Sequence, residues 1–400
     1  MPLAGALASA TVKTAWFILK KVKPILHKTL HALILGAIVK VKLSSKFKFL
    51  LGTCSDIMRY NKIKNMAEFA ALIGVSRPTV SKYFNDPESV RPSTRDRIEA
   101  ALKEYDYRPN IYAINQNRRL TKTIGIVVPY LADPFFAEIA RMLERRCIAA
   151  GFTPSLFSSH GEQALENTIL DNLRSLKPAG VLLAPLGRTS DRKHIEAFCH
   201  DVPTILFDSN IEGVGAAFVG SDNFSFVSQT VEYLSRTGNV PCFFEMKDPA
   251  NPNANKRRLA YLEIMNRLNL EPHIIKIDGK GWSFEEIGRQ GALKILQEKA
   301  LPTNTVLCSN DRLAIGFLSA CHELGISVGR DEGCSIRVAS HDDHPYARYT
   351  CPSLTTAAHD YESVSDYALS TLFQLIESGG RLEKRQETVF AARLIMRDSA

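Results

Sequence analysis

The sequence lacks an apolar run long enough to cross a membrane and lacks cysteines spaced for metal or redox chemistry. Its most apolar stretch, Ala32–Val39, is far shorter than the roughly 20 residues that a spanning helix needs, and lysines flank it closely. No small-residue cleavage site follows that stretch, so we expect neither a signal peptide nor a membrane anchor. The eight cysteines are scattered without a Cys-x-x-Cys pair, which is typical of reduced core cysteines in a cytoplasmic protein.

Motifs of common enzyme classes are also missing. The chain has no Gly-x-Ser-x-Gly, no Gly-rich phosphate loop that ends in Lys-Ser or Lys-Thr, and no His-Glu-x-x-His. The run His341–His344 contains two histidines and two aspartates, but four consecutive residues on an extended backbone cannot readily surround one ion. We therefore expect a protein that is not an enzyme and that has no cofactor and no metal.

Charge is distributed unevenly along the chain. Residues 1–57 have nine lysines and one acidic residue, residues 58–123 have 13 basic and 7 acidic residues, and residues 124–400 have a net charge of −6. The first segment is either a basic tail that contacts DNA or a membrane, or a stretch upstream of the true start at Met58, and we favour the second. The argument for nucleic-acid binding therefore rests on residues 58–123.

That second segment shows the spacing of a small helical domain. Apolar residues at helical intervals predict a helix over 66–73, and Gly74 suits the tight turn after it. Ser76 is a good N-cap for a second helix that continues to Phe84. A third helix is expected to begin at a cap formed by Ser93, with a buried stripe made of Ile98, Ala101, Leu102 and Tyr105. The pattern is that of a helix-turn-helix.

From Thr123 onward, short apolar strands alternate with amphipathic helices. The expected strands are 124–128, 154–157, 180–183, 204–207, 241–244, 273–277, 305–308 and 335–339. The expected helices are 135–150, 162–175, 191–199, 256–268, 284–298 and 312–323. Buried strands separated by helices predict doubly wound parallel sheets, here in two α/β lobes. A ligand cleft is expected where the carboxyl ends of the strands of the two lobes face each other.

A series of motifs, in order along residues 61–400, resembles the LacI/GalR (lactose-repressor) family of transcriptional regulators. The motifs are FA at 69–70, IGVS at 73–76, TVS at 79–81, VRPSTR at 90–95, YRPN at 107–110 with Ala113, IGIVVP at 124–129, DPFF at 133–136, SND at 309–311, PSLTT at 352–356 and MRDS at 396–399. The resemblance implies a DNA-binding headpiece, a hinge helix and a two-lobed core like that of the type I periplasmic binding proteins.

The resemblance also implies the domain boundaries. We expect a basic extension over 1–57, a helix-turn-helix headpiece with its hinge helix over 58–123, and an effector-binding and dimerisation core over 124–400. Lobe one of this core is expected to comprise about 124–222 and 357–382, and lobe two about 223–353 and 386–400. The chain would then cross between the lobes three times.

Candidate DNA-binding residues follow from the same resemblance. Arg77, Pro78 and Lys82 lie near the start of the second helix and would face base edges, with the two basic side chains favouring guanine. Groups expected to contact phosphates are Ser76, Thr79, Asn85 and Thr94.

The expected hinge helix spans 109–119 and includes Asn110, Ala113 and Gln116. The family often inserts a leucine between base pairs at the position of Gln116. Either Ile114 replaces that leucine, or the operator is bent less.

Candidate effector-binding residues in the core are Asp133, Asp208, Arg258, Trp282, Asn310, Asp342 and Tyr361. Carboxylates, a guanidinium, an amide and aromatic faces suit a hydroxyl-rich ring. Because Lys256 and Arg257 adjoin Arg258, an acidic group on the ligand is also compatible. We expect a sugar, a polyol or a sugar acid.

Taken together, the sequence predicts a cytoplasmic regulator, in particular a repressor, that binds an inverted-repeat DNA operator as a homodimer or tetramer. Its DNA affinity is expected to depend on the small-molecule effector, and no membrane is involved. The alternative is a periplasmic sugar-binding receptor of a transporter, because the core alone has the same pattern. Residues 66–110 argue against that alternative, since a secreted receptor has no use for a helix-turn-helix.

Overall fold

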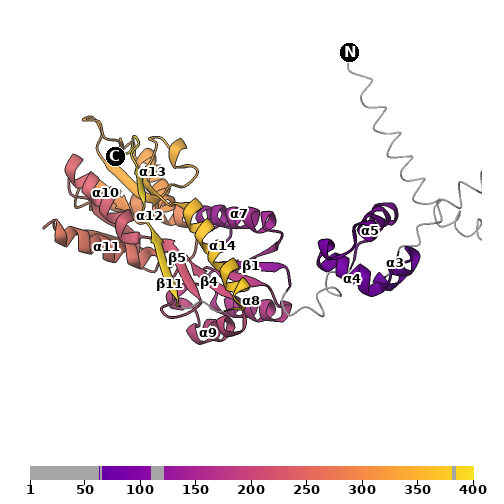
Figure 1. The fold of residues 1–400 in the computed structure, drawn as a ribbon. Helices are drawn as coiled ribbons and strands as arrows, with labels where there is room; N and C mark the ends of the chain where they lie inside the picture. The colour runs from indigo at the N-terminus through magenta and orange to yellow at the C-terminus, as the bar shows by residue number, and fades with distance from the viewer. Residues whose placement is uncertain (1–62, 64, 110–120, 381–383) are drawn as a thin grey trace, which may run out of the picture. The chain divides into compact units, whose positions relative to one another are not determined.

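Three short α-helices form the amino-terminal unit in the computed structural model, which describes residues 63, 65–109, 121–380 and 384–400 (Figure 1). The helices are α3 (Met66–Leu72), α4 (Arg77–Asn85) and α5 (Pro92–Tyr105), with a 3-10 turn η1 (Pro87–Ser89) before α5. The Oγ of Ser76 accepts a hydrogen bond from the backbone N–H of Thr79 at 3.2 Å, which confirms Ser76 as the N-cap of α4. Gly74 has a φ of +60°, a conformation that glycine adopts without strain, in the turn between α3 and α4.

The core of this unit contains an aromatic pair that the sequence pattern did not predict. Tyr107 is buried and its ring stacks on Phe69, with 4.5 Å between ring centroids. Tyr105, which was expected inside, is 40% exposed. Helix α5 ends at Tyr105, and Asp106 has a left-handed φ of +43°, so the chain turns and carries Tyr107 inward instead. The prediction of Ser93 as a cap was also wrong, because α5 begins at Pro92.

The first lobe of the core contains a six-stranded parallel sheet with the order β11-β5-β4-β3-β1-β2. Its strands are β1 (Thr123–Val128), β2 (Thr153–Ser158), β3 (Gly180–Leu183), β4 (Thr204–Phe207), β5 (Ala217–Ser221) and β11 (Gln386–Phe390). Helices α7 (Pro134–Ala149) and α14 (Tyr361–Glu377) pack on one face of this sheet, and α8 (Gln163–Leu176) and α9 (Arg192–Asp201) pack on the other (Figure 1). A 3-10 turn η2 (Gly187–Thr189) precedes α9.

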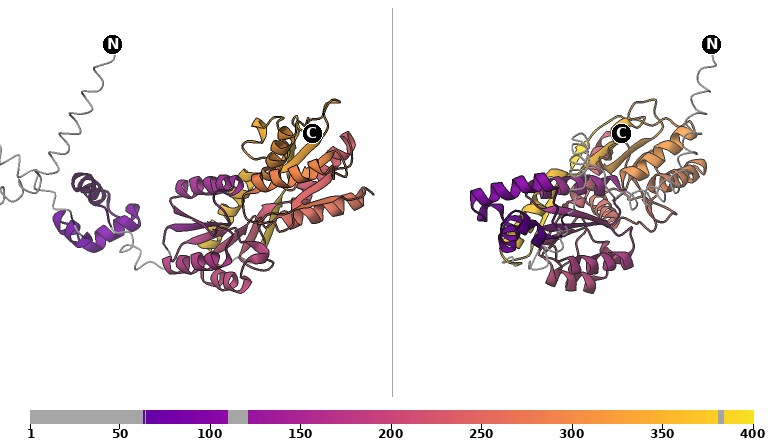
Figure 2. Two further views of the ribbon diagram at one scale, coloured as in Figure 1. Left: turned by 180° about the vertical axis from the view of Figure 1, so that it is seen from behind. Right: turned by 90° about the vertical axis from the view of Figure 1, so that its right-hand side faces the viewer.

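The second lobe repeats this three-layer plan around a sheet with the order β12-β10-β9-β8-β6-β7. Its strands are β6 (Cys242–Met246), β7 (Ile274–Ile277), β8 (Thr305–Cys308), β9 (Arg337–Asp342), β10 (Thr355–Ala358) and the antiparallel β12 (Arg393–Ile395). Helices α10 (Asn223–Thr237) and α11 (Ala254–Arg267) cover one face, and α12 (Phe284–Gln297) and α13 (Asp311–Glu323) cover the other (Figure 2). A 3-10 turn η3 (Ala347–Tyr349) follows β9.

The chain passes between the two sheets in three places: after β5, after β10 and after β11. Two expected lobe boundaries therefore need correction. Residues 386–390 were placed in lobe two, but they form β11, which pairs with β5 in the first sheet. Residues 357–358 were placed in lobe one, but they end β10, which pairs with β9 in the second sheet.

Within the described part of the chain, no helix combines the length and the apolar character that a membrane span requires.

Candidate functional site

The exposed face of α4 carries the side chains that were expected to read DNA bases. Arg77, Pro78 and Lys82 are all exposed, whereas Val80 on the same helix is buried in the core of the unit. Since Arg77 and Pro78 occupy the first helical turn and Lys82 lies one turn further on, the helix can present them together to a groove.

The groups expected to contact phosphates occupy the same unit. The hydroxyls of Ser76 and Thr79 lie 2.8 Å apart at the start of α4, Asn85 is exposed at its end, and Thr94 is half-buried in the first turn of α5. The expected hinge residues Asn110, Ala113, Ile114 and Gln116 lie outside the described residues.

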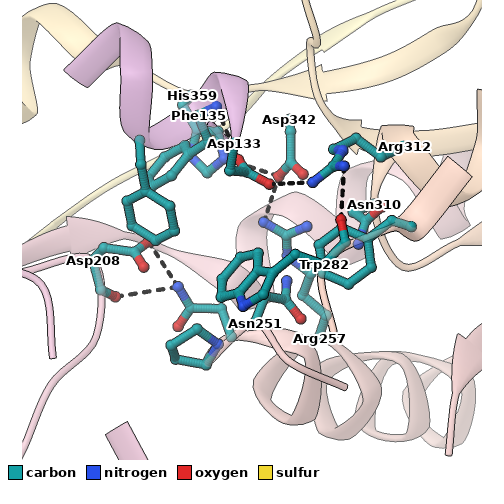
Figure 3. A pocket seen from close by; sticks show the side chains of 14 residues that line it. Asp133, Phe135, Asp208, Asn251, Arg257, Trp282, Asn310, Arg312, Asp342 and His359 are labelled. Atoms are coloured by element: carbon teal, nitrogen blue, oxygen red, sulfur yellow. Dashed lines mark hydrogen bonds and ion pairs between the residues drawn. The ribbon is translucent and has the colours of Figure 1, made fainter. Parts of the chain in front are cut away.

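A pocket in the core lies where the strands of the two lobes end (Figure 3). Asp208 directly follows β4, Asn310 lies two residues after β8, and Asp342 is the last residue of β9. This placement is the one expected for ligand sites of parallel sheets. The lining residues are Asp133, Phe135, Phe136, Asp208, Asn251, Pro252, Asn253, Arg257, Trp282, Phe284, Asn310, Arg312, Asp342 and His359.

Five of the seven candidate effector residues line this pocket: Asp133, Asp208, Trp282, Asn310 and Asp342. Arg258 does not, because its guanidinium lies 3.4 Å from the buried carboxylate of Glu245. Tyr361 lines a smaller neighbouring pocket, and its hydroxyl donates to the backbone carbonyl of Asp342 at 3.5 Å.

Arg257 lines the pocket in place of Arg258. The buried positions of α11 recur at helical intervals, and Arg257 falls on that stripe whereas Arg258 does not. This periodicity is a signal in the sequence that could have indicated which arginine lines the pocket.

Other residues that line the pocket were not predicted from the sequence. Among them are Phe135, Asn251, Asn253, Arg312 and His359. Phe135 belongs to the quoted DPFF motif and Arg312 follows the SND motif directly, so proximity to a motif was the available signal for both. Nothing in the local sequence distinguishes the two asparagines of the loop before α11.

Asp342 is the centre of a hydrogen-bonded group in the pocket. Its Oδ1 accepts from Nη2 of Arg257 at 2.6 Å and lies 3.0 Å from Nε2 of His359, whose Nδ1 lies 2.7 Å from the Ser221 hydroxyl. Burial alone would raise the pKa of Asp342, but Arg257 and His359 outweigh it and hold that pKa below its usual range. Asp342 is therefore ionised at neutral pH.

His359 connects this group to the segments that join the lobes. It lies between β10 and α14, and its partner Ser221 ends β5 just before the chain enters α10. Burial lowers the pKa of His359 despite the neighbouring Asp342, so we expect a neutral ring that bridges the two.

Two polar contacts, which we term the inter-lobe contacts, join the lobes across the pocket. Arg312 of α13 donates to Oδ2 of Asp133, the N-cap of α7, at 3.0 Å. Nδ2 of Asn253, which caps α11, donates to Oδ1 of Asp208 at 2.8 Å. Figure 3 shows the Arg312 contact beside Asp342 and the Asp208 contact on the opposite side of the pocket. Any ligand in the pocket would therefore adjoin both contacts.

Aromatic rings complete the pocket wall. The Trp282 ring of lobe two stacks on Tyr130 of lobe one, with 5.0 Å between ring centroids, and it also lines the pocket. Phe135 and Phe136 supply further apolar surface from α7. Such faces pack against the apolar faces of sugar-like rings.

The run His341–His344 does not converge on one point. Asp343 pairs with Arg397 at 2.6 Å, and the backbone N–H of His344 donates to Asp311 at 2.7 Å, while Asp342 faces Arg257. In the described ranges, no group of three or more His, Cys, Asp or Glu side chains is arranged to hold a metal ion.

Comparison with known proteins agrees with this architecture. The family model described as "Bacterial regulatory proteins, lacI family" matches residues 65–110, and the model "Periplasmic binding protein-like domain" matches residues 236–400. The ribose operon repressor of Escherichia coli strain K12 is 26% identical over 315 residues, which are 78% of this chain and 92% of the repressor.

Solved structures show the same fold. The structure of the lac repressor dimer bound to operator and the anti-inducer ONPF has a TM-score of 0.72 and 24% identity, and the match covers 84% of this chain and 99% of that one. The complex of the transcriptional regulator CelR with cellobiose has a TM-score of 0.59 and 21% identity, over 84% and 100% of the two chains.

A helix-turn-helix unit and a two-lobed core of the periplasmic-binding-protein type define a ligand-responsive regulator. The chain belongs to the LacI family of DNA-binding transcriptional regulators, with an effector-binding core. Regulators of this family are not enzymes. The match over residues 65–110 also favours a regulator over the alternative, a transport receptor.

Proposed function

We propose that this chain is a cytoplasmic repressor that binds an inverted-repeat operator as a homodimer and responds to a small, hydroxyl-rich effector held in the core pocket. The dimeric state and the operator are proposed by analogy with the lac repressor dimer, whose structure contains an operator. The effector class is proposed from the polar and aromatic lining of the pocket, and the CelR complex with cellobiose supports it.

The inter-lobe contacts are the observation that carries the proposal. Asp133 and Asp208 belong to lobe one, whereas Arg312 and Asn253 belong to lobe two, and all four line the pocket. A ligand there must either bridge these pairs or replace them, so its binding energy depends on the relative position of the lobes. A ligand shifts a conformational equilibrium only through such a difference in affinity.

Operator affinity should change with the position of the lobes. Residues 110–122 connect the headpiece to β1, the first strand of lobe one. Couplings of this kind are typically about 1–3 kcal/mol, which corresponds to roughly 5- to 150-fold in affinity.

The test uses the full chain and an operator selected from random DNA. Sugars and polyols are first screened for ligands that raise the melting temperature, and operator affinity is then titrated with each ligand found. Asn251→Trp should fill the pocket and remove both responses, whereas Asn172→Trp, on the exposed face of α8, should leave both intact. A ligand response that survives in Asn251→Trp would place the effector elsewhere.

A further inference from the structure

The positive charges that line the pocket are already neutralised by carboxylates. Arg257 donates to Asp342 at 2.6 Å and to the backbone carbonyl of Ser309 at 2.8 Å. Arg312 donates to Asp133 at 3.0 Å and to both carboxylate oxygens of Glu285 at 2.7 and 2.8 Å. An anionic ligand would therefore have to displace a carboxylate from its guanidinium partner, which leaves a buried charge unpaired and is strongly unfavourable.

Two buried amide oxygens at the pocket, in contrast, have no hydrogen-bond partner among the described residues. Asn253 is 7% exposed, its Nδ2 is committed to Asp208, and its buried Oδ1 has no hydrogen-bond partner among the described residues. The buried Oδ1 of Asn251, in the same loop, has no partner within that part of the chain either. Leaving such a buried oxygen without a donor is unfavourable, so the site favours a ligand that brings donors.

The net charge of the pocket residues also favours a cationic ligand. Three carboxylates line the pocket, from Asp133, Asp208 and Asp342, against the two guanidinium groups of Arg257 and Arg312. Counting the neighbours Glu285 and Lys256 adds one charge of each sign. One negative charge therefore remains in excess.

We propose that the effector carries a protonated amine, as amino sugars and amino polyols do, and that this amine lies between the carboxylate of Asp208 and the amide oxygen of Asn253. An ammonium group has three donors and no acceptor, which matches these two oxygens. The aromatic wall formed by Trp282 and Phe135 then covers the carbon skeleton. This inference rests on the proposed function, since it assumes that the pocket is the effector site.

The pH dependence of binding should reflect Asp208. Burial raises the pKa of Asp208 to about 6, although Lys256 and Arg257 lower it, and the neighbouring carboxylates of Asp342 and Asp133 raise it further. His359 and Tyr361 also adjoin Asp208; burial lowers the pKa of His359 and raises that of Tyr361, so burial favours the neutral form of both side chains. Since the ammonium prefers the ionised carboxylate, affinity for the amine should fall by up to about tenfold per pH unit below that pKa.

Two matched trios of probes test the inference: glucosamine, glucose and glucuronate, and 1-amino-1-deoxyglucitol, glucitol and gluconate. We expect the amine of at least one trio to raise the melting temperature of the full chain and to bind at least about tenfold more tightly than its neutral and acidic counterparts. Stronger binding of an acid, equal binding of the neutral member, or no stabilisation by either amine would overturn the inference.

Variants then locate the amine. Asp208→Asn should remove the preference for the amine over the neutral member and the fall in affinity at low pH, whereas Glu332→Gln, at an exposed turn, should retain both. An unchanged preference in Asp208→Asn would contradict the proposed position. An amine that binds without changing operator affinity would support this inference and refute the proposed function, whereas a neutral or acidic effector that changes operator affinity would do the reverse.

Discussion

At the scale of single residues, the buried carboxylate of Asp208 lowers the stability of the native state when it is ionised, and the same charge is available to a ligand. Its pKa is raised from 3.8 to about 6, so the native state holds its proton more tightly than the unfolded state does. The contribution of Asp208 to stability therefore declines as pH rises from 3.8 to about 6 and is least favourable above that value. Its left-handed φ of +60° is one that asparagine also tolerates.

Asp208→Asn should consequently stabilise the ligand-free protein at neutral pH. We expect the free energy of unfolding to rise by roughly 1–3 kcal/mol near pH 7.5, and the gain to shrink toward zero below about pH 4, where both states are protonated. Urea unfolding at the two pH values measures the difference. A gain of the same size at both would show that the charge of Asp208 is not its cause.

Arg77 provides a second prediction at this scale. Because it is exposed in the first turn of α4, Arg77→Ala should cost about 1–3 kcal/mol in binding to the selected operator and much less on random DNA. Fluorescence anisotropy with the two DNAs measures both values. Equal losses would mean that Arg77 contacts only phosphates.

The sequence predicted the residue types of the pocket better than their positions. Asp133, Asp208, Trp282, Asn310 and Asp342 were placed in it through the resemblance to a family. Arg257 lines the pocket where the family resemblance had indicated Arg258, because an alignment can slip by one residue whereas the helical period of α11 cannot. The asparagines at 251 and 253 are set by the path of a loop, which sequence patterns do not describe.

At the scale of elements, α12 and α13 pack closely because each helix has a glycine that faces the backbone of the other helix. A Cβ on Gly316 would lie 2.1 Å from the backbone carbonyl oxygen of Glu285, and a Cβ on Gly288 would lie 2.5 Å from that of Leu313. Backbone atoms cannot move aside as the end of a side chain can. The pair therefore fixes the position of α13, which carries the pocket residue Arg312.

Gly316→Ala should thus destabilise the protein although alanine favours helix formation. Overpacking of this kind typically costs about 1–3 kcal/mol, and we expect a loss in that range in urea unfolding. Gly333→Ala is the control, since a Cβ there meets nothing within 4 Å, and it should stay within about 0.5 kcal/mol of the parent. A neutral Gly316→Ala would show that the two helices can separate at little cost.

Element prediction succeeded where strands were short, apolar and fully buried. Strands β3, β4 and β8 were predicted with their observed bounds, because every residue in them is buried and turns flank them. The elements that were not predicted are strands β5, β10, β11 and β12 and helices α10 and α14. Strand β5 and helix α10 adjoin the first crossing between the lobes, where Ser221, Asp222 and Asn223 interrupt the apolar pattern.

At the scale of the whole molecule, periodicity could indicate two lobes but not how the chain is shared between them. The assignment of β11 to the first sheet and β10 to the second depends on strand pairing over large sequence separations. The sequence of such a short strand does not indicate which of the two sheets the strand joins. The three crossings join the two lobes whose residues line the pocket.

The distribution of charge leads to a prediction about residues 1–57. If this segment does not take part in DNA binding, its deletion should leave both operator affinity and the slope of log K against log salt concentration nearly unchanged. Each lysine that does neutralise a phosphate would instead add about 0.9 to that slope. Anisotropy titrations of the full chain and of residues 58–400 over a series of salt concentrations decide between these outcomes.

The central claim is that the core pocket and the DNA-binding unit influence each other, and reciprocity tests it most directly. The affinity for the effector, measured by calorimetry with and without saturating operator, should change by the same factor as operator affinity changes with saturating effector. We predict a factor of roughly 5 to 150 in both measurements. Equal affinity for the effector in the presence and absence of operator would contradict the account, however tightly the effector binds.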